Sequence, residues 1–257
     1  MSDTNPSQRR RARLINAALA LGCALLGAAA GWYWQAGSIG ADGKGALPER
    51  DRVAVEQVVH DYLMAHPEIL PEAMAEYDRK KNLGELNAVR GAVEQASLGT
   101  VLGNPRGKLT LVEFTDYACG YCRHSVSDVD ALIAANPDLR VVVRELPILT
   151  PASADAAKMA IAAAEQGRYP QFHQAMFASG RPDAGTIAEA ARAAGIDMAR
   201  AQRVIADPKT EAELVRNLDL ARQLGFSGTP SWVIGDAMMT GAVGADRLAK
   251  AVADARS

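Results

Sequence analysis

Two stretches rich in apolar and β-branched residues, at 109–115 and 139–146, stand out along the chain. Runs of this length and composition predict buried strands. Between them, residues 120–135 have helical character, and the pattern stops at Asn136-Pro137. A strand, a helix and a second strand of these lengths predict a right-handed parallel crossover, which is the basic unit of an α/β fold.

A long helical tract follows the second strand. Glycine or proline interrupts it repeatedly, which predicts helices at about 153–166, 170–179, 185–194, 198–206 and 211–224. Strand signals return only at 231–234 and 238–240, before a last predicted helix at about 245–255. We therefore expect one α/β domain over residues 98–257, with a helical insertion at about 152–226 between two parts of its sheet.

A smaller helical region, residues 49–97, precedes this domain. Apolar residues recur at helical spacing up to His66-Pro67, and a second helix is predicted to start near Pro71. The region is too short to bury a core of its own. We expect it to pack on the main domain or on a second copy of itself, which makes it a possible oligomerisation arm.

The N-terminal region predicts membrane attachment. Residues 14–34 carry no formal charge, and a helix of this length, at about 1.5 Å per residue, just spans a hydrocarbon core of roughly 30 Å. The arginines within residues 1–13 predict a cytoplasmic basic tail, and residues 35–48 predict a flexible linker. A signal-peptidase site at 28–30 and a poorly fitting lipoprotein box at Cys23 are alternatives; in each case the body is exported.

Composition narrows the choice of function. With 49% hydrophobic and 23% charged residues the chain is typical of globular proteins, and its net charge of −2 gives no electrostatic footprint for nucleic acid. Only Cys119 and Cys122 of the three cysteines fall in the exported part. A framework of structural disulfides would show several spaced pairs, so these two residues predict a reactive pair instead.

Cys119-Gly-Tyr-Cys122 lies where the first predicted strand passes into the helix. That order places Cys119 at the exposed helix N-terminus, where unpaired backbone N–H groups and the helix dipole favour a thiolate. A stabilised thiolate is what thiol–disulfide exchange requires. Zinc binding is the alternative, but it needs two further ligands, and the exported part offers only isolated histidines, so no metal and no cofactor is expected.

Four features together carry a family resemblance. They are Glu113-Phe114 ahead of the cysteine pair, Leu146-Pro147 after the second strand, the helical insertion, and Gly228-Thr-Pro230 before a late strand. With them, residues 98–257 resemble the DsbA-like branch of the thioredoxin superfamily, which implies a thioredoxin-like fold. Residues 61–70 are also similar to the N-terminal region of DsbA-like relatives associated with copper-stress suppression, which can oligomerise.

The position on the helix assigns roles to the two sulfurs: Cys119, at the exposed start, attacks client sulfur, and Cys122, one turn inside, resolves the mixed disulfide. The resemblance implies roles for the other site residues. Thr229 precedes a cis Pro230 and offers strand-like hydrogen bonds to a client, beside Gly120 and Tyr121 of the dipeptide. Glu113 lies under the pair, where a buried carboxylate of raised pKa relays a proton to or from Cys122. The alternative for Glu113 is an edge-strand residue that faces water.

The dipeptide bears on the direction of the reaction. Strongly oxidising relatives usually carry Pro-His there, whereas this chain has Gly120-Tyr121, which cannot stabilise a thiolate by charge. We therefore predict a reduction potential nearer the isomerase range than the value of about −120 mV of the strongest oxidants. His124, just after the pair, is either a thiolate neighbour or a solvent-exposed residue, and the sequence does not decide between them.

The sequence as a whole predicts a bacterial inner-membrane protein with a single span and a catalytic domain in the periplasm. It would form, reduce or isomerise disulfides in exported proteins, with a membrane redox partner to reset the pair. The alternative is a copper(I)-handling or chaperone-like thiol protein, since soft thiolates favour copper(I) and Met238-Met239 adds thioether sulfur.

Overall fold

A computed structural model describes residues 48–96 and 98–256 of the chain. Packing divides the chain into two compact units, with the boundary between Pro71 and Glu72. The predicted tail 1–13, the predicted anchor 14–34 and all but the last residue of the linker 35–48 lie outside the described residues. Within the described part, no helix is both long and apolar enough to cross a membrane.

The N-terminal extension forms two helices, α2 (Glu49–Ala65) and α3 (Ile69–Glu94). In the first unit, α2 leaves a series of large apolar side chains exposed: Val53, Val55, Val58, Val59 and Tyr62. Most of α3 belongs to the second unit, and its last turns bury Leu86 and Val93 completely. This part of the extension therefore packs on the main domain, which is one of the two arrangements that the sequence predicts.

A five-stranded sheet forms the centre of the second unit, with strand order β1-β3-β2-β4-β5. β2 (Leu109–Thr115) and β3 (Leu139–Glu145) are parallel, as the crossover predicts, whereas β4 (Ser231–Ile234) pairs antiparallel with β2. β5 (Ala237–Thr240) and β1 (Val101–Gly103) form the two edges. The sequence did not predict β1, because three residues are too few to show alternation.

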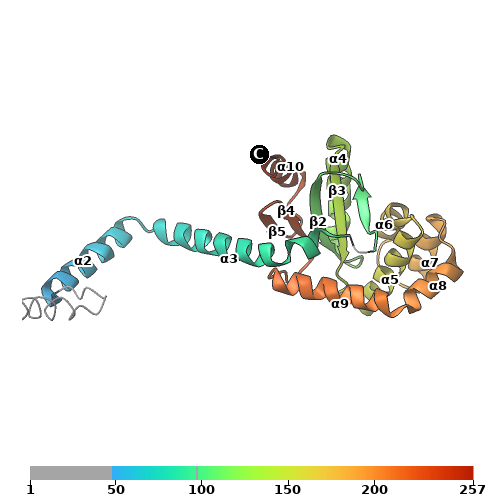
Figure 1. Ribbon diagram of the computed structural model, residues 1–257, viewed down its shortest axis with the longest axis horizontal. Coiled ribbons are helices and arrows are strands. Elements are labelled where there is room, and N and C mark those ends of the chain that lie inside the picture. The colour runs from blue at the N-terminus through green and yellow to red at the C-terminus, as the bar shows by residue number, and fades with distance from the viewer. Residues whose placement is uncertain (1–47, 97, 257) are drawn as a thin grey trace, which may run out of the picture. The chain divides into compact units, whose positions relative to one another are not determined.

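Helices cover the sheet (Figure 1). α4 (Gly120–Ala135) follows β2, and α10 (Ala245–Asp254) ends the described chain. The insertion comprises α5 (Pro151–Glu165), α6 (Tyr169–Ala178), α7 (Ala184–Ala193), α8 (Met198–Ala206) and α9 (Pro208–Gln223). The last is longer than predicted, because Pro208 begins a helix at its first position, where proline needs no N–H partner, instead of breaking one. Figure 1 shows α5 to α8 gathered beside the sheet.

The two faces of the sheet pack against different helices, because side chains alternate along a strand. Odd-numbered residues of β2 and β3, such as Leu111 and Val143, join a cluster that contains Val129 of α4. We call this side the α4 face. Even-numbered residues join a second cluster with residues of α3 and α9, and we call that side the α3 face; its members include Val112, Phe114, Val142, Leu86, Val93 and Leu220.

Candidate active site at the start of helix α4

Cys119 is the N-cap of α4, and its backbone is extended (φ −82°, ψ 117°). Its Sγ accepts a hydrogen bond from the backbone N–H of Cys122 at 3.4 Å, so the sulfur satisfies one of the free donors at the helix end. Both cysteines are free thiols. The sulfur of Cys119 therefore lies at the N-terminus of α4, where the order strand, Cys-x-x-Cys, helix predicts it.

The attacking sulfur is less exposed than the sequence predicts. Cys119 is 5% exposed and Cys122 is 0% exposed. The loop that ends in Pro230 packs against the pair, and the Cys119 thiol donates to the backbone oxygen of Thr229 at 3.3 Å. This loop is distant in sequence from the cysteines, so the Cys-x-x-Cys motif alone does not predict that it covers them. The order of exposure of the two sulfurs is nevertheless the predicted one.

Thr229 and Pro230 join through a cis peptide bond, as the resemblance implies. The contact between Thr229 and Cys119 places a backbone carbonyl directly beside the first sulfur. A main-chain group in this position is suited to pair with an extended client segment next to the disulfide. The docking role of Thr229 and Pro230 remains a prediction.

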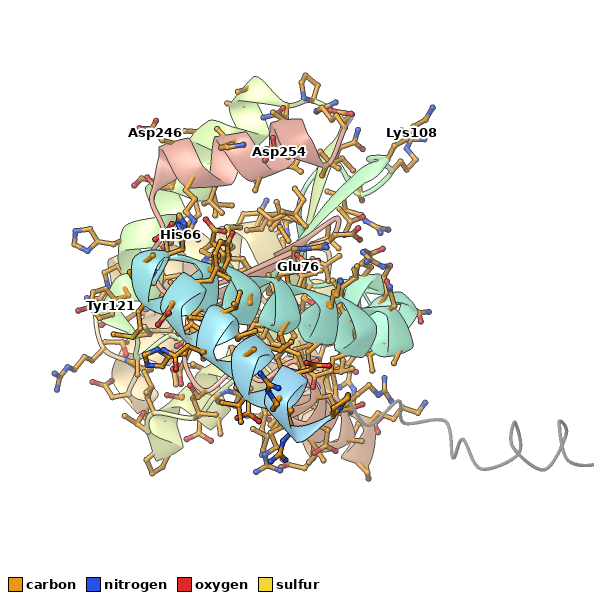
Figure 2. The ribbon with its side chains drawn as sticks, turned by 90° about the vertical axis from the view of Figure 1, so that its left-hand side faces the viewer. His66, Glu76, Lys108, Tyr121, Asp246 and Asp254 are labelled. Atoms are coloured by element: carbon orange, nitrogen blue, oxygen red, sulfur yellow. The ribbon has the colours of Figure 1, made fainter. Side chains whose placement is uncertain are left out.

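The dipeptide between the cysteines faces solvent. Tyr121 is 70% exposed, and Figure 2 labels it at the surface. A Cβ built on Gly120 would meet nothing within 4 Å, so the space beside the pair is open on this side. His124 is exposed as well, which favours the solvent-exposed alternative for this residue.

Glu113 lies on β2, which is an inner strand with β3 on one side and β4 on the other. The residue is 3% exposed, so the alternative of an edge-strand glutamate that faces water is wrong. Burial raises the pKa of Glu113 to about 8, and the nearby Thr115 hydroxyl partly opposes this shift. The carboxyl is therefore largely protonated near neutral pH.

Cys122 and Glu113 hinder each other's ionisation. Burial raises the pKa of the Cys122 thiol well above its usual value, and the charge of Glu113 raises it further. Hydroxyls of Thr115 and Thr229 and the backbone of Asp116 act in the opposite direction. When a disulfide opens, a proton must reach the Cys122 sulfur, and Glu113 is an acid close enough to influence it electrostatically.

A second buried carboxyl lies on the same face, at the end of β3. Glu145 is 1% exposed, and its Oε1 accepts hydrogen bonds from Tyr169 Oη at 2.8 Å and from Tyr117 Oη at 3.1 Å. His173 Nδ1 lies 3.3 Å from both hydroxyls. Burial raises the pKa of Glu145 to about 8 and lowers that of His173 to about 3, so the group is neutral near pH 7.

This network was not predicted from the sequence. A glutamate at the end of an apolar strand is the same signal that singled out Glu113, so the sequence does carry a signal for Glu145. It carries none for the partners of Glu145, because Tyr117 comes from the loop before α4, and Tyr169 and His173 come from the first turns of α6. Only the folded insertion brings these residues together.

Asp116 ties two loops together beneath the cysteine pair. Its Oδ1 accepts from the backbone N–H of Ala118 at 2.8 Å. Its Oδ2 accepts from the backbone N–H groups of Ile148 at 2.9 Å and of Leu149 at 3.0 Å. The side chains of Ile148 and Leu149 are 41% and 51% exposed, so this carboxylate fixes an apolar loop as well as the entry to α4. Asp116 was not predicted from the sequence either.

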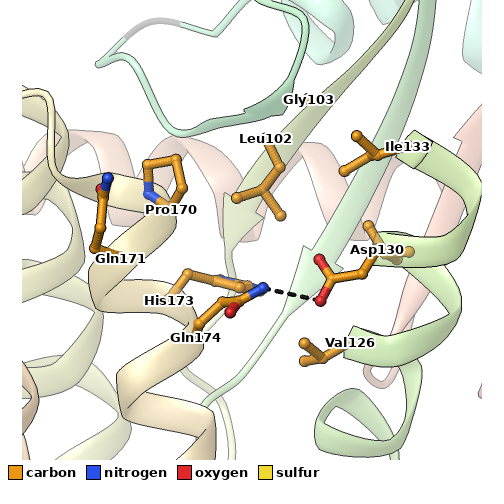
Figure 3. Close-up of a pocket in the computed structure, with 10 residues that line it drawn as sticks. Leu102, Gly103, Val126, Asp130, Ile133, Pro170, Gln171, His173 and Gln174 are labelled. Carbon is orange, nitrogen blue, oxygen red and sulfur yellow. Dashed lines mark hydrogen bonds between the residues drawn. The ribbon is translucent and has the colours of Figure 1, made fainter. Parts of the chain in front are cut away.

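A pocket of about 270 Å³ lies between α4, α6 and β1 (Figure 3). Its lining includes His173, Val126 and Leu102, and Asp130 accepts a hydrogen bond across it from Gln174 at 2.8 Å. The volume is below the usual range of small-molecule sites, which is about 300–1,000 Å³. The cysteines do not line it, so it is not part of the candidate redox site.

Comparison with known proteins agrees with this geometry. The family model of the DSBA-like thioredoxin domain matches residues 110–253, which include both cysteines, Glu113 and Pro230. A second family model, the N-terminal domain of the copper resistance protein ScsC, matches residues 51–82, in α2 and the first half of α3.

Solved structures and curated proteins give further similarities. A thioredoxin-like oxidoreductase from Silicibacter pomeroyi DSS-3 is 41% identical, with a TM-score of 0.62, over 65% of this chain and 97% of that one. A linker-deletion variant of Proteus mirabilis ScsC is 27% identical, with a TM-score of 0.66, over 83% and 99%.

The curated relative Na(+)/H(+) antiporter NhaA 3 from Salinispora tropica is 29% identical over 60% of this chain, but the match spans only 24% of the antiporter. That share gives no basis for assigning antiport to this chain. The family match, in contrast, covers more than half of the chain and contains the candidate site. The chain therefore belongs to the DSBA-like thioredoxin domain family, whose members include thiol–disulfide oxidoreductases.

Proposed function

We propose that this protein is an extracytoplasmic thiol–disulfide oxidoreductase that forms, reduces or isomerises disulfides in exported proteins through Cys119 and Cys122. The observation that carries the proposal is the position of the Cys119 sulfur. The sulfur accepts a hydrogen bond from a backbone N–H in the first turn of α4, and it also contacts the Thr229 carbonyl. The same sulfur is therefore next to a helix end that stabilises a thiolate and next to backbone groups that a client segment could pair with.

The two sulfurs divide the reaction. In the reducing direction, the Cys119 thiolate attacks a client disulfide, a mixed disulfide forms, and the client's second sulfur leaves. Cys122 then attacks the Cys119 sulfur, the client's first sulfur leaves, and the pair ends as an intramolecular disulfide. Cys122 must lose its proton in the second step, and Glu113 is the base in our proposal, because it is buried close to the thiol.

The direction in the cell depends on the reduction potential. The Gly120-Tyr121 dipeptide has no charged side chain to stabilise the thiolate, which supports a potential nearer the isomerase range. Equilibration with glutathione buffers, followed by quantification of the free thiols, measures this potential. A value at or above about −120 mV would make the protein a strong oxidant and contradict this part of the proposal.

We also propose that α2 and the first half of α3 form an oligomerisation arm. The exposed valines and Tyr62 of α2 support it, because a monomer gains nothing by leaving such a series in water. The match of residues 51–82 to the ScsC N-terminal domain supports it too. Light scattering tests the arm by comparison of fragments 49–257 and 83–257, the second of which lacks the matched residues; if both are monomers, the arm is not an oligomer interface.

Membrane attachment is part of the same proposal. The uncharged segment 14–34 and the arginines before it support a single-span inner-membrane anchor with the domain in the periplasm. Fractionation of cells that produce the full chain, combined with protease access from the periplasmic side, tests both points. Recovery of the full-length protein in the soluble fraction would contradict the predicted anchor.

The copper(I) alternative has less support. Met238 and Met239 point to opposite faces of the sheet, and Met238 packs with the α3 face cluster while Met239 packs with the α4 face cluster. They therefore do not add two thioethers to one site. In the described part of the chain, no three His, Cys, Asp or Glu side chains converge on a possible metal position.

Catalysed insulin reduction and refolding of scrambled ribonuclease separate these functions. We expect turnover at substoichiometric protein, loss of turnover in Cys119→Ser, and accumulation of mixed disulfides in Cys122→Ser. Stoichiometric copper(I) uptake without turnover would refute the proposed function.

A further inference from the structure

Thr115, the last residue of β2, has a buried hydroxyl without an ordinary hydrogen bond. The residue is 0% exposed, and its Oγ1 has no hydrogen-bond partner. Burial of an unpaired hydroxyl costs free energy, and valine has nearly the same shape without that cost. The hydroxyl therefore needs an explanation other than packing.

The position of Thr115 on the strand explains what surrounds it. Thr115 and Glu113 are two residues apart on β2, so both point to the α4 face, below the first turn of α4. Cys122, fully buried in that turn, belongs to the same cluster of side chains. Strand alternation and the crossover thus bring a carboxyl, a hydroxyl and a thiol together at the end of the sheet.

The Thr115 hydroxyl acts on both of its reactive neighbours. It lowers the pKa of Glu113 and also that of Cys122, because a nearby hydroxyl favours the charged form of each group, although no hydrogen bond of ordinary geometry joins them in this structure. Thr229 has a second buried, unpaired hydroxyl near Cys122, but it has no such effect on Glu113. Of these two hydroxyls, Thr115 is thus the one that influences both the carboxyl and the thiol.

We propose that the Thr115 hydroxyl is a catalytic proton relay between Glu113 and Cys122. This inference rests on the proposed function, because it concerns how Cys122 gains and loses its proton during disulfide exchange. A hydroxyl suits the role, since it donates one hydrogen and accepts through two lone pairs at the same time. No ordered water is then needed between two groups that are both closed to solvent.

The steps balance in each direction. When Cys122 resolves a mixed disulfide, its thiol proton passes to the Thr115 oxygen while the Thr115 hydrogen passes to the Glu113 carboxylate. The Cys122 sulfur bonds to the Cys119 sulfur, and the client sulfur leaves with the electron pair of the broken S–S bond. When a client thiolate opens the Cys119–Cys122 bond, Glu113 gives its proton to Thr115, and Thr115 protonates the departing Cys122 sulfur.

Other titratable groups also face this site and must be considered in any pH profile. β3 contributes Glu145, the loop before α4 contributes Asp116 and Tyr117, α4 contributes Cys119, and α6 contributes Tyr169 and His173. In contrast to Thr115, Glu145 is linked to Glu113 through charge alone, since the charge of Glu113 raises the pKa of Glu145, and Glu145 has no hydrogen bond to either cysteine. The profile of Glu145→Gln therefore serves as a reference for purely electrostatic effects.

The test follows the reaction of reduced protein with oxidised glutathione, by acid quench and mass spectrometry. Formation of the Cys119–glutathione mixed disulfide and its decay by attack of Cys122 are then separate rates. We expect Thr115→Val to slow the decay by at least about 10-fold at pH 7, since general acid–base catalysis typically contributes about 10²–10⁴-fold. Formation should be unchanged, and Thr115→Ser should restore the decay.

The pH dependence identifies the relay. In the native protein the decay rate should rise with pH as Glu113 ionises, and the rise should flatten in Thr115→Val and in Glu113→Gln. The double variant should be no slower than the slower single variant, because the two substitutions interrupt the same proton path.

Thr100→Val is the matched control. It also removes a buried threonine hydroxyl from the domain, one that donates to Val143 O at 2.7 Å, and it should leave both rates unchanged.

The outcomes separate this inference from the proposed function. If the native protein never converts the mixed disulfide into the Cys119–Cys122 disulfide, the proposed function fails. If it does so and Thr115→Val decays at the native rate, or the two losses multiply in the double variant, the relay alone is overturned. Thr115→Ala gives the same readout should the valine variant fail to fold, and a native decay rate in it would also overturn the relay.

Discussion

Arg144 and Glu145 are consecutive residues of β3, equally buried at 2% and 1% exposure, yet they belong to different parts of the molecule. Alternation points Arg144 to the α3 face and Glu145 to the α4 face. On the α3 face, the Arg144 guanidinium donates to a carboxylate, an amide and several backbone carbonyls. On the α4 face, the Glu145 carboxyl accepts only from hydroxyl groups. The difference separates a structural charge from a titrating one.

Arg144 joins three elements on the α3 face. It donates to Glu213 Oε1 at 3.0 Å and to Asn217 Oδ1 at 3.1 Å, both on α9. It also donates to backbone oxygens at the end of α3, from Ala92, Val93 and Gln95. Burial lowers the pKa of Arg144, but the Glu213 carboxylate opposes the shift, and a guanidinium stays charged in proteins. Such a residue fixes structure and does not exchange protons.

The α4 face has no equivalent cation. In the described part of the chain, neither Glu113 nor Glu145 takes part in an ion pair, and Glu145 Oε2 has no hydrogen-bond partner at all. Each carboxyl also raises the pKa of the other or of a neighbouring group. A buried carboxyl of this kind remains neutral until a nearby reaction changes the local charge, which suits the surroundings of a thiol pair.

The largest expected effect is on the α3 face. Arg144→Met removes the buried cation that pairs with Glu213, so this buried carboxylate keeps only its ion pair with the exposed Arg216, and the carbonyls at the end of α3 lose their guanidinium donor. Loss of one member of a buried ion pair costs about 3–5 kcal/mol, so we expect a decrease of this size in the free energy of unfolding, measured with urea. The resolving rate of the protein that remains folded should not change.

Arg140→Met is the control for this prediction. Arg140 is half-buried on the same strand, and it donates to Thr110 Oγ1 at 2.8 Å and to Glu94 O at 3.3 Å. It has no buried carboxylate to leave behind, so its loss should cost much less. Equal losses in the two variants would contradict the assignment of Arg144 as the structural charge of this face.

A smaller effect, with a definite dependence on pH, is expected on the α4 face. The folded protein holds the pKa of Glu145 at about 8, above the usual value of 4.5. The folded state therefore binds protons more tightly than the unfolded state, and stability falls as pH rises from about 4.5 to about 8. Glu145→Gln should reduce this slope by on the order of 1 kcal/mol per pH unit.

Urea denaturation of the reduced protein at pH 5, 6, 7 and 8 measures the slope. Glu165→Gln, a substitution at an exposed position of α5, should leave it unchanged. A slope in Glu145→Gln equal to that of the native protein would mean that Glu145 ionises in the folded state as easily as in the unfolded chain, and the contrast with Arg144 would disappear.

The sequence predicted the elements far better than it predicted this contrast. Both inner strands, α4 and the cysteine pair follow from local periodicity and spacing, and the cis peptide bond at Thr229-Pro230 followed from the resemblance. The role of Arg144 depends on α3 and α9, which lie about 50 and 70 positions away in sequence. Contacts of that range leave no periodic signal, so a basic residue in an apolar strand gave no indication of its partners.

The smallest predicted effect concerns the two hydroxyls that oppose the raised pKa of Glu145. Tyr169→Phe removes the shorter of its two hydroxyl contacts, at 2.8 Å, and Tyr117→Phe removes the other, at 3.1 Å. Each loss should cost about 1 kcal/mol in the free energy of unfolding. Both hydroxyls lower the pKa of Glu145, so removal of either should raise that pKa further and extend the fall in stability to higher pH. In a Glu145→Gln background the extension should vanish, because no proton is left to titrate. If the tyrosine variants instead behave the same in both backgrounds, the hydroxyls serve packing alone.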